Sequence, residues 1–520
     1  MALPHQNTND AVSILTTRLQ ALSAERLRGI RRGIEKESLR ALPGGALAQT
    51  PHPLLLGSAL THPRVTTDFS ESQVELITGA HLTVAQCLAD LADTHQAVYH
   101  ALQAEGHGER LWVSSMPCCL PDEEHIPIGQ YGHSNVGRAK TVYRTGLSHR
   151  YGRRMQTISG IHYNWSIPGA GSDDYFGLIR NFRRQSFLLL WLFGASPAVC
   201  KSFVDGLPHG LDPLGPGTLH LPHATSLRMG RLGYQSDAQS RLAVSYNGLA
   251  GYGGSLQAAL TAPYPPYEKI GLRDEDGNWK QLSTHLLQIE NEFYGTIRPK
   301  RTIRTGERPL HALRERGVEY IEVRCMDLDP FETIGIGATT AHFLDVFLLH
   351  CLLLDSPPDT PDEIAALGRN QHLTAARGRE PGLKLERNGR ELLLVDWAAE
   401  IVDQCGPIAR TLDDLHGGTA HRDALAAAQR ALAIPATLPS ARVIEVMQRE
   451  YRGEFAPFID TRSTQAAEQI LSRPLPDPDA HSRWAAEAAT SLVEQRRMEE
   501  AETLTFEEFL ADYLSPAKLG

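Results

Sequence analysis

The chain has 520 residues, of which 42% are hydrophobic, and its 51 Lys and Arg against 61 Asp and Glu give a formal net charge of −10. This length is sufficient for a large buried core and for more than one domain. An acidic chain lacks the clustered positive charge of nucleic-acid-binding proteins, so we expect no nucleic-acid partner. The most apolar run, residues 187–200, is interrupted by Gly194, Ser196 and Pro197. It falls short of the roughly 20 residues that a membrane span needs, so no membrane span is expected.

The first ten residues, MALPHQNTND, show neither the basic nor the apolar segment of a signal peptide. Seven cysteines follow without a CxxC pair or the spacing of a metal finger, which predicts reduced thiols and a cytoplasmic location. We interpret them as small buried side chains and assign none to catalysis. They are Cys87, Cys118, Cys119, Cys200, Cys325, Cys351 and Cys405.

Hydrophobic periodicity predicts a helix over residues 10–32, ended by Gly33, and a strand over residues 34–40. An extended segment over residues 68–77 and a long helix over residues 84–104 come next. Further strand-like segments, rich in β-branched and aromatic residues, are expected at residues 160–168, 243–247, 288–297 and 318–327. Because regular helices do not alternate with these segments, an antiparallel sheet with helices on one side fits better than a doubly wound sheet.

The composition changes after about residue 350, where a turn-rich junction leads into a part rich in Ala, Leu and Arg. Residues 474–478 are expected to form a loop within it. The amphipathic helices expected in this part cover residues 419–434, 440–452, 480–501 and 506–514. We therefore divide the chain into a region that carries the chemistry, residues 1–350, and a mainly helical region, residues 351–520.

Acidic residues and one histidine recur on separate strand-like segments, each beside large apolar residues. Alternate residues of a strand face the same side, so Glu35 and Glu37 share a face, as do Glu322 and Arg324. Each group alone is also consistent with a solvated strand edge or a core histidine. Buried unpaired charges are very costly, however, so a buried set of this kind is normally paired or bound to metal. The set comprises Glu35, Glu37, Asp68, Glu75, His162 and Glu322.

A set rich in oxygen ligands with one imidazole suits Mg²⁺ or Mn²⁺ better than Zn²⁺. Several such cations in one cleft are typical of phosphate chemistry. The chain has neither a GxxxxGK[ST] loop nor a GxGxxG turn between strand and helix, so any ATP is expected to bind on a sheet surface through metals. Three candidate contacts to its phosphates, Arg298, Lys300 and Arg301, are equally consistent with a solvated basic turn. The other positive side chains available are Arg228 and Arg324.

Long sequence blocks in a fixed order resemble the glutamate–cysteine ligases typical of proteobacteria. The similarity is nearly continuous from about residue 28 to residue 350, whereas the C-terminal third is similar only in general character. The blocks are GIEKESLR (33–40), TTDFSESQVELIT (66–78), SMPC (115–118), YGHSNVGRAKTVYRTGL (131–147), YGRRMQTISGIHYNWSIP (151–168), FGASPAVC (193–200), LPHATSLRMGRLGY (221–234), LLQIENEFYGTIRPKR (286–301) and GVEYIEVRCMDLDPF (317–331).

This resemblance implies an α+β fold of the glutamine-synthetase type, in which a curved, mainly antiparallel sheet holds metals, ATP and substrates on its concave face. It implies ligation of the γ-carboxyl of L-glutamate to the amine of L-cysteine, the first step of glutathione biosynthesis. ATP is cleaved to ADP and phosphate through a γ-glutamyl phosphate, with Mg²⁺, or alternatively Mn²⁺, as the metal.

The resemblance also implies residue roles. The family's metal ligands fall on the acidic and histidine set named above, and Glu35 is also expected to be catalytic. Arg324 would face the transferred phosphate, and Arg228 would bind a substrate carboxylate. The pocket for cysteine would be formed by Tyr143, Leu147, Tyr234 and Tyr294.

The chain departs from the family near the expected mouth of the site. The segments over residues 168–175 and 205–216 are shorter than in the enterobacterial relatives, and Trp165 stands where a Phe is common. Three alternatives therefore stay open: a ligase for another small amine such as 2-aminobutyrate, a metal-dependent hydrolase, and an inactive homologue. The oligomeric state is also open.

Overall fold

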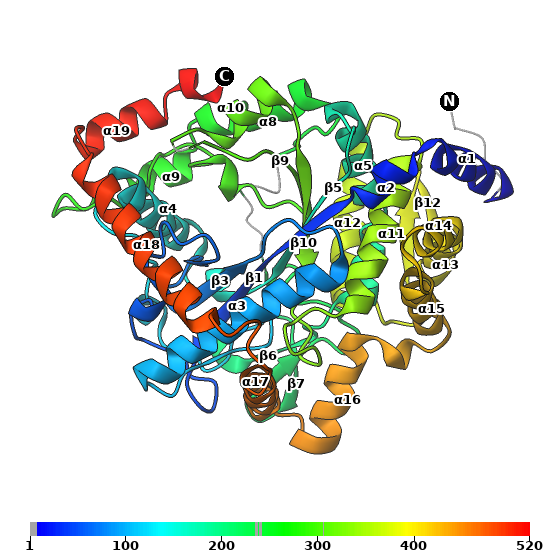
Figure 1. Cartoon of the computed structure of the whole chain (residues 1–520), viewed down its shortest axis with the longest axis horizontal. Helices are drawn as coiled ribbons and strands as arrows, with labels where there is room; N and C mark the ends of the chain where they lie inside the picture. Colours follow the sequence, from blue (N-terminus) through cyan, green and yellow to red (C-terminus); the bar gives the residue numbers. More distant parts are fainter. Residues whose placement is uncertain (1–7, 234–237, 239–241, 305) are drawn as a thin grey trace.

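The computed structural model describes residues 8–233, 238, 242–304 and 306–520, and its centre is one antiparallel sheet (Figure 1). The strands lie in the order β2-β3-β1-β5-β10-β9, and β4 pairs with the far end of β1. Their bounds are β1 Arg31–Ala41, β2 Val65–Thr67, β3 Gln73–Ile77, β4 Arg110–Leu111, β5 Ile161–Ser166, β9 Ile297–Lys300 and β10 Tyr320–Met326.

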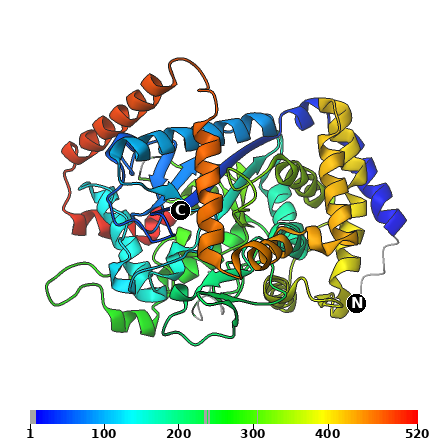
Figure 2. The ribbon, with the colours of Figure 1, turned by 90° about the horizontal axis from the view of Figure 1, so that it is seen from below.

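The two faces of this sheet differ because side chains alternate along each strand. One face carries buried apolar residues such as Val74, Tyr163 and Val323 and packs against helices. The helices are α3 (Val84–Glu105), α5 (Ser172–Gln185), α6 (Phe187–Phe193) and α11 (Ala338–Leu353). Figure 2 shows α3, in blue, lying along the sheet. The opposite face carries the polar residues of the site.

The remaining helices surround this core, and the largest hydrophobic cluster joins both parts of the chain. Phe347 of α11 and Trp397 of α13 belong to the same cluster. The remaining α-helices are α1 Thr8–Ala21, α2 Ala24–Arg28, α4 Asn135–Tyr151, α8 Leu249–Thr261, α9 Pro265–Ile270, α10 Pro309–Arg316, α12 Pro361–Arg377, α13 Leu394–Gln404, α14 Gly406–His416, α15 Ala420–Ala433, α16 Pro439–Tyr451, α17 Phe455–Leu471, α18 Ala480–Glu500 and α19 Phe506–Tyr513. Two small sheets contain β6 (Ala198–Cys200), β7 (Asp212–Gly215) and β8 (Thr218–His220), and β11 (Lys384–Arg387) and β12 (Arg390–Leu393).

The structure confirms the α+β class, the antiparallel sheet, the long helix after residue 84 and the four C-terminal helices. In this part of the chain, sequence periodicity missed α12, α13, α14 and α17 and the hairpin formed by β11 and β12. Within the described part of the chain, no helix combines the length and the apolar character needed to cross a membrane.

The single helix predicted over residues 10–32 is wrong, because the chain forms α1 and α2 with a break between them. Ser23 causes the break by capping α2, where its side chain accepts a hydrogen bond of 3.2 Å from the Arg26 N–H. The strand then starts earlier than predicted, and Gly33 lies inside β1 opposite Asn164 instead of ending a helix.

Two predicted strands are also wrong. Residues 243–247 belong to none of the described strands. Instead, the Arg180 guanidinium donates to the Tyr246 carbonyl at 2.8 Å, and the Ser255 hydroxyl accepts from the Ser245 N–H. Most of residues 288–297 form a turn that includes a short 3₁₀ helix, Glu290–Glu292, and β9 begins only at residue 297. The buried carboxylates of this turn pair with two arginines outside it, Glu292 with Arg150 and Glu290 with Arg308, which sets its path.

A buried ion pair fixes the end of β1 next to the loop that carries Asp68. The Arg40 guanidinium, fully buried, lies 2.7 Å from the Glu109 carboxylate and donates to the Thr50 and Glu71 carbonyls at 2.7 and 3.0 Å. Removing one partner of such a pair leaves an uncompensated charge away from water.

We therefore expect Glu109→Gln to lower the free energy of unfolding by about 3–5 kcal/mol, measured by urea denaturation. The matched control is Glu124→Gln, since the Glu124 side chain is 81% exposed, and its change should stay within about 0.5 kcal/mol. Equal stability of the two variants would contradict a structural role for the buried pair.

Candidate functional site

Strand register brings together side chains that are far apart in the sequence. Glu35 of β1 lies opposite His162 of β5, and Glu37 lies opposite Glu75 of β3. Glu322 of β10 is paired with Arg298 of β9. All of these side chains line one cavity on the polar face of the sheet.

His162 is the centre of the acidic group. Its Nδ1 lies 3.2 Å from a Glu35 oxygen and 3.8 Å from a Glu322 oxygen, and its Nε2 lies 3.8 Å from a Glu37 oxygen. Burial lowers the pKa of His162, and the nearby Arg324 charge lowers it further, which favours the neutral imidazole that can ligate a metal.

Cations gather on the β10–β9 side of the cavity. Glu322 lies 3.1 Å from the Lys300 ammonium and 2.9 Å from the Arg324 guanidinium. Burial alone would raise the pKa of Glu322, but these two cations outweigh it and hold the pKa well below its usual range. In turn, Glu322 outweighs the burial of Lys300 and Arg324 and raises the pKa of both. This side of the cavity is permanently charged.

The β1–β3 side instead holds acidic groups close to one another. Burial, and then repulsion from Asp68, raises the pKa of Glu37 to about 8. Burial, followed by repulsion from Glu35 and Asp68, raises the pKa of Glu75 well above its usual value. Because these carboxylates repel one another and are rich in oxygen donors, the set fits hard divalent cations such as Mg²⁺.

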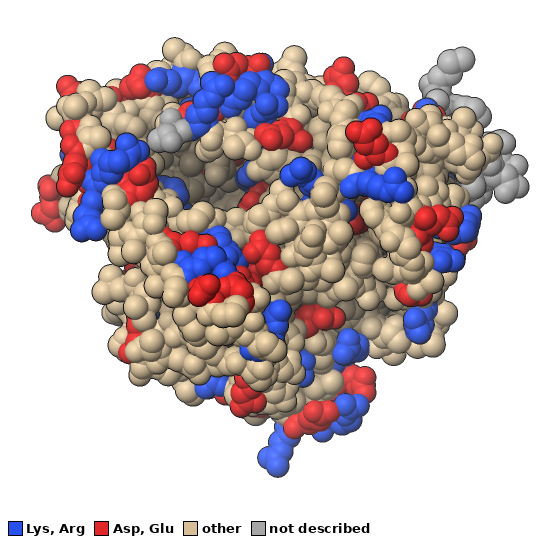
Figure 3. Space-filling view, in the orientation of Figure 1, with Lys and Arg blue, Asp and Glu red and all other residues tan. Residues whose placement is uncertain are grey.

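The cavity has a volume of about 600 Å³, and Figure 3 shows a hollow with charged residues around it on this face of the molecule. Tyr143 and Leu147, both on α4, form part of its wall together with Tyr294. The Tyr294 hydroxyl accepts a hydrogen bond of 2.9 Å from the Gln156 amide. Tyr234, also predicted for this pocket, lies outside the described residues.

Arg228 reaches the cavity from the loop after β8, with its guanidinium against the end of β10. It donates to the Arg324 carbonyl at 2.8 Å and to the Met326 carbonyl at 3.2 Å. A Cβ at Gly160 would lie 2.0 Å from this guanidinium, so a residue without a side chain is needed there. The packing fixes the position of Arg228 beside the acidic group.

The three candidate phosphate contacts separate along β9. Arg298 and Lys300 line the cavity, whereas Arg301 is absent from the described residues that line it. The Arg301 guanidinium instead donates to the Arg316 carbonyl at 2.8 Å. Strand alternation explains the difference, since residues 298 and 300 share a face.

Several cavity residues were missed by sequence reasoning. Lys140 and Arg144 line the cavity beside Tyr143, and burial together with Arg144 lowers the pKa of Lys140 to about 8. Their helical spacing relative to Leu147 was a usable signal. Phe509 and Tyr513 of α19 also line it, but no local pattern indicates that a C-terminal helix returns to the site.

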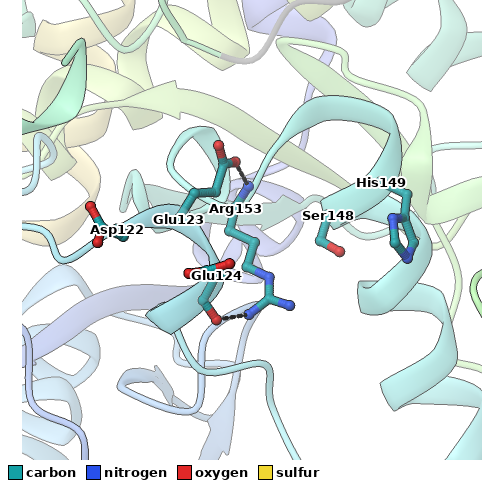
Figure 4. Close-up of a pocket in the computed structure, with 6 residues that line it drawn as sticks. All are labelled: Asp122, Glu123, Glu124, Ser148, His149 and Arg153. Atoms are coloured by element: carbon teal, nitrogen blue, oxygen red, sulfur yellow. Dashed lines mark hydrogen bonds between the residues drawn. The ribbon is translucent and has the colours of Figure 1, made fainter. Parts of the chain in front are cut away.

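A second hollow, of about 370 Å³, lies on the surface between residues 122–124 and the end of α4 (Figure 4). The Arg153 guanidinium donates to the Glu124 carbonyl at 2.7 Å, and the Arg153 N–H donates to the Glu123 carboxylate. These bonds hold the turn after α4. None of the predicted site residues that the structure describes lines this hollow, and the acidic set lies in the larger cavity.

Comparison with known proteins gives a consistent result. The sequence profile described as glutamate-cysteine ligase matches residues 16–171 and 168–374. The glutamate–cysteine ligase of Pseudomonas entomophila is 46% identical over 96% of this chain and 97% of its own length. The chain belongs to the glutamate–cysteine ligase family. The Azotobacter vinelandii glutamate–cysteine ligase is 47% identical over 94% of each chain.

Solved structures agree with this membership. The crystal structure of glutamate–cysteine ligase from Francisella tularensis in complex with AMP matches with a TM-score of 0.89 and 35% identity, over 94% of this chain and 98% of the other. A bifunctional glutathione synthetase from Pasteurella multocida matches with a TM-score of 0.66 and 24% identity, over 89% of this chain and 55% of the other. The second match supports the glutamine-synthetase-like fold alone.

The raised pKa of Glu37 has a consequence for stability. Between its usual value of 4.5 and about 8, the folded chain keeps a proton on Glu37 that the unfolded chain has released. The free energy of unfolding should therefore fall as pH rises through this window. Since Glu37→Gln cannot ionise, we expect it to unfold at a higher temperature than the wild type at pH 8, with a smaller difference at pH 5. Thermal melts in a chelator at both pH values measure this, and a difference that does not change with pH would contradict it.

Proposed function

We propose that the chain joins the γ-carboxyl of L-glutamate to the amine of L-cysteine, with ATP cleaved to ADP and phosphate. The proposal is supported by membership of the glutamate–cysteine ligase family over nearly the whole chain. The observation that carries it is the charge arrangement of the cavity, which places clustered carboxylates and fixed cations on opposite sides of one polar sheet face. We propose further that residues 1–350 carry the reaction and that residues 351–520 support them.

The acidic set would hold Mg²⁺, or alternatively Mn²⁺. When bound, such cations neutralise the charge between the ATP phosphates and the glutamate γ-carboxylate. The residues proposed to hold them are Glu35, Glu37, Asp68, Glu75, His162 and Glu322. Glu35 is suited to this role because the Asn164 amide donates to one of its oxygens at 2.9 Å, while the other faces His162.

In the first step, a γ-carboxylate oxygen attacks the terminal phosphorus of ATP, the bond to ADP breaks, and γ-glutamyl phosphate forms. A carboxylate is a poor acyl donor, and phosphorylation supplies a stable leaving group. Arg324, held by Glu322, is placed to stabilise the charge that develops on the transferred phosphate. Lys300 and Arg298 line the same side and would contact ATP phosphates.

In the second step, the amine of cysteine attacks the acyl carbon, phosphate leaves, and the amine loses a proton to give γ-glutamylcysteine. Tyr143, Leu147 and Tyr294 would form the pocket that holds cysteine, and Tyr234 is proposed as a fourth member. Arg228 would bind a substrate carboxylate from the neighbouring wall. Holding the amine next to the acyl phosphate lowers the barrier by fixing the orientation of the reactants.

The deciding experiment measures ADP release and dipeptide formation by the purified protein with Mg²⁺, ATP and glutamate, with and without cysteine. We expect ADP release to require both amino acids and Glu35→Gln to lower kcat by about 10³-fold or more, because a group that positions both anions is lost. ADP release that follows 2-aminobutyrate or glycine instead of cysteine would change the amine. Hydrolysis without ATP, or no turnover at all, would contradict the proposal.

The proposed cysteine pocket predicts a separation of kinetic effects. We expect Tyr294→Ala to raise KM for cysteine by roughly 10-fold or more, since it removes an aromatic wall and the Gln156 bond, while KM for ATP stays within about twofold. Tyr451→Ala is a matched control, since Tyr451 lies on α16, packs against Phe458 and is outside the set of described cavity residues. An unchanged KM for cysteine in Tyr294→Ala would place the pocket elsewhere.

A further inference from the structure

Three cysteines meet at one point, although the sequence shows only an adjacent pair and a third residue far away. Cys118 and Cys119 lie in the loop after β4, and Cys200 ends β6. The Cys118 and Cys119 sulfurs are 3.6 Å apart, and the three sulfurs all lie within 4.8 Å of one another. The grouping is made by tertiary contact between the loop and the small β6–β8–β7 sheet.

Two of the three thiols are buried and one is exposed. Cys118 and Cys200 belong to the second hydrophobic cluster, which also contains Trp112 and Phe455, whereas Cys119 is exposed. All three are absent from the described residues that line the 600 Å³ cavity. The group is therefore separate from the proposed ligase site, and a solute can reach it from the side of Cys119.

The backbone at Cys119 is held in a conformation that a non-glycine residue rarely adopts. Its φ is +44°, in the left-handed region, a conformation that persists only where the surroundings impose it. The Leu120 N–H donates to the Ser202 hydroxyl at 3.1 Å, which ties this turn to the chain just beyond Cys200. The strained turn thus carries the Cys119 sulfur next to the Cys118 sulfur.

We propose that Cys118, Cys119 and Cys200 form a three-thiolate site for one soft d¹⁰ metal cation, with Zn²⁺ and Cd²⁺ as representatives. Metal–sulfur bonds of about 2.3 Å in a tetrahedral arrangement place the sulfurs roughly 3.8 Å apart, close to the spacing of Cys118 and Cys119. Thiolate sulfur selects this class of ion over Mg²⁺. The fourth position would be open to water on the exposed side.

Binding requires three thiolates, so one divalent cation displaces three protons and leaves a complex of net charge −1. All three thiols release their protons to the solvent as their sulfurs bind the cation.

The test is a titration of the full-length, reduced protein with Cd²⁺ in the presence of excess Mg²⁺, followed by the thiolate-to-cadmium charge-transfer absorbance. Carboxylate ligands give no such band, so binding at the acidic set does not interfere. We expect saturation at one Cd²⁺ per chain and displacement by Zn²⁺. Cys119→Ser should weaken binding at least 100-fold, and because Cys119 is exposed this variant should fold as the wild type does.

Cys87→Ala is the matched control, since Cys87 is buried in the other hydrophobic cluster, and it should bind like the wild type. The proposal fails if the reduced wild type, with all seven thiols confirmed by denatured thiol titration, shows no charge-transfer band. It also fails if Cys119→Ser keeps the band and the affinity. Loss of ligase activity has no bearing on either outcome, so this site and the proposed function are tested separately.

Discussion

The structure depends on a sheet that holds acidic side chains against one another in a partly buried cavity. Glu37 and Glu75 are directly opposite on neighbouring antiparallel strands, an arrangement that destabilises a sheet when both carboxyls are ionised. Burial and the neighbouring acidic groups raise the pKa of each. The opposite face offsets this cost, since the same strands bury Val74, Leu76, Ile34 and Ile161 against helices. Apolar packing on one face thus keeps in place a polar face that would otherwise push its strands apart, and a site for cations results.

The charges on this face are also ordered across the sheet. Excess acid lies on β1 and β3, while Arg298, Lys300 and Arg324 lie on β9 and β10, with Glu322 between the two groups. A reaction between two anions needs such an order, because one anion must be activated while the charge that develops on the other is stabilised.

Period-two alternation in the sequence was enough to place Glu35 with Glu37 and Glu322 with Arg324, because strand geometry acts over neighbouring residues. It could not give the register between strands, which sets the distances to His162. The strand predicted over residues 288–297 was wrong because it, too, depends on contacts between distant parts of the fold. Their β-like composition is outweighed by ion pairs made outside the segment, Glu290 with Arg308 and Glu292 with Arg150 of α4. The grouping of Cys118, Cys119 and Cys200 is likewise made by a tertiary contact, which cysteine spacing in the sequence does not indicate.

The C-terminal segment illustrates how far such contacts extend the site beyond the sheet. Arg308 binds the Glu290 carboxylate at 2.7 Å and donates to the Tyr513 carbonyl at 2.8 Å, so one buried guanidinium joins the turn before β9 to α19. Its cation also lies over the Tyr513 ring, 4.8 Å from the centroid. Because Phe509 and Tyr513 line the cavity, the last helix forms part of its wall. A change of sequence in this helix would therefore alter the shape of the cavity without changing the acidic set. The residues that carry out the reaction are thus distinct from those that shape the space for the substrates.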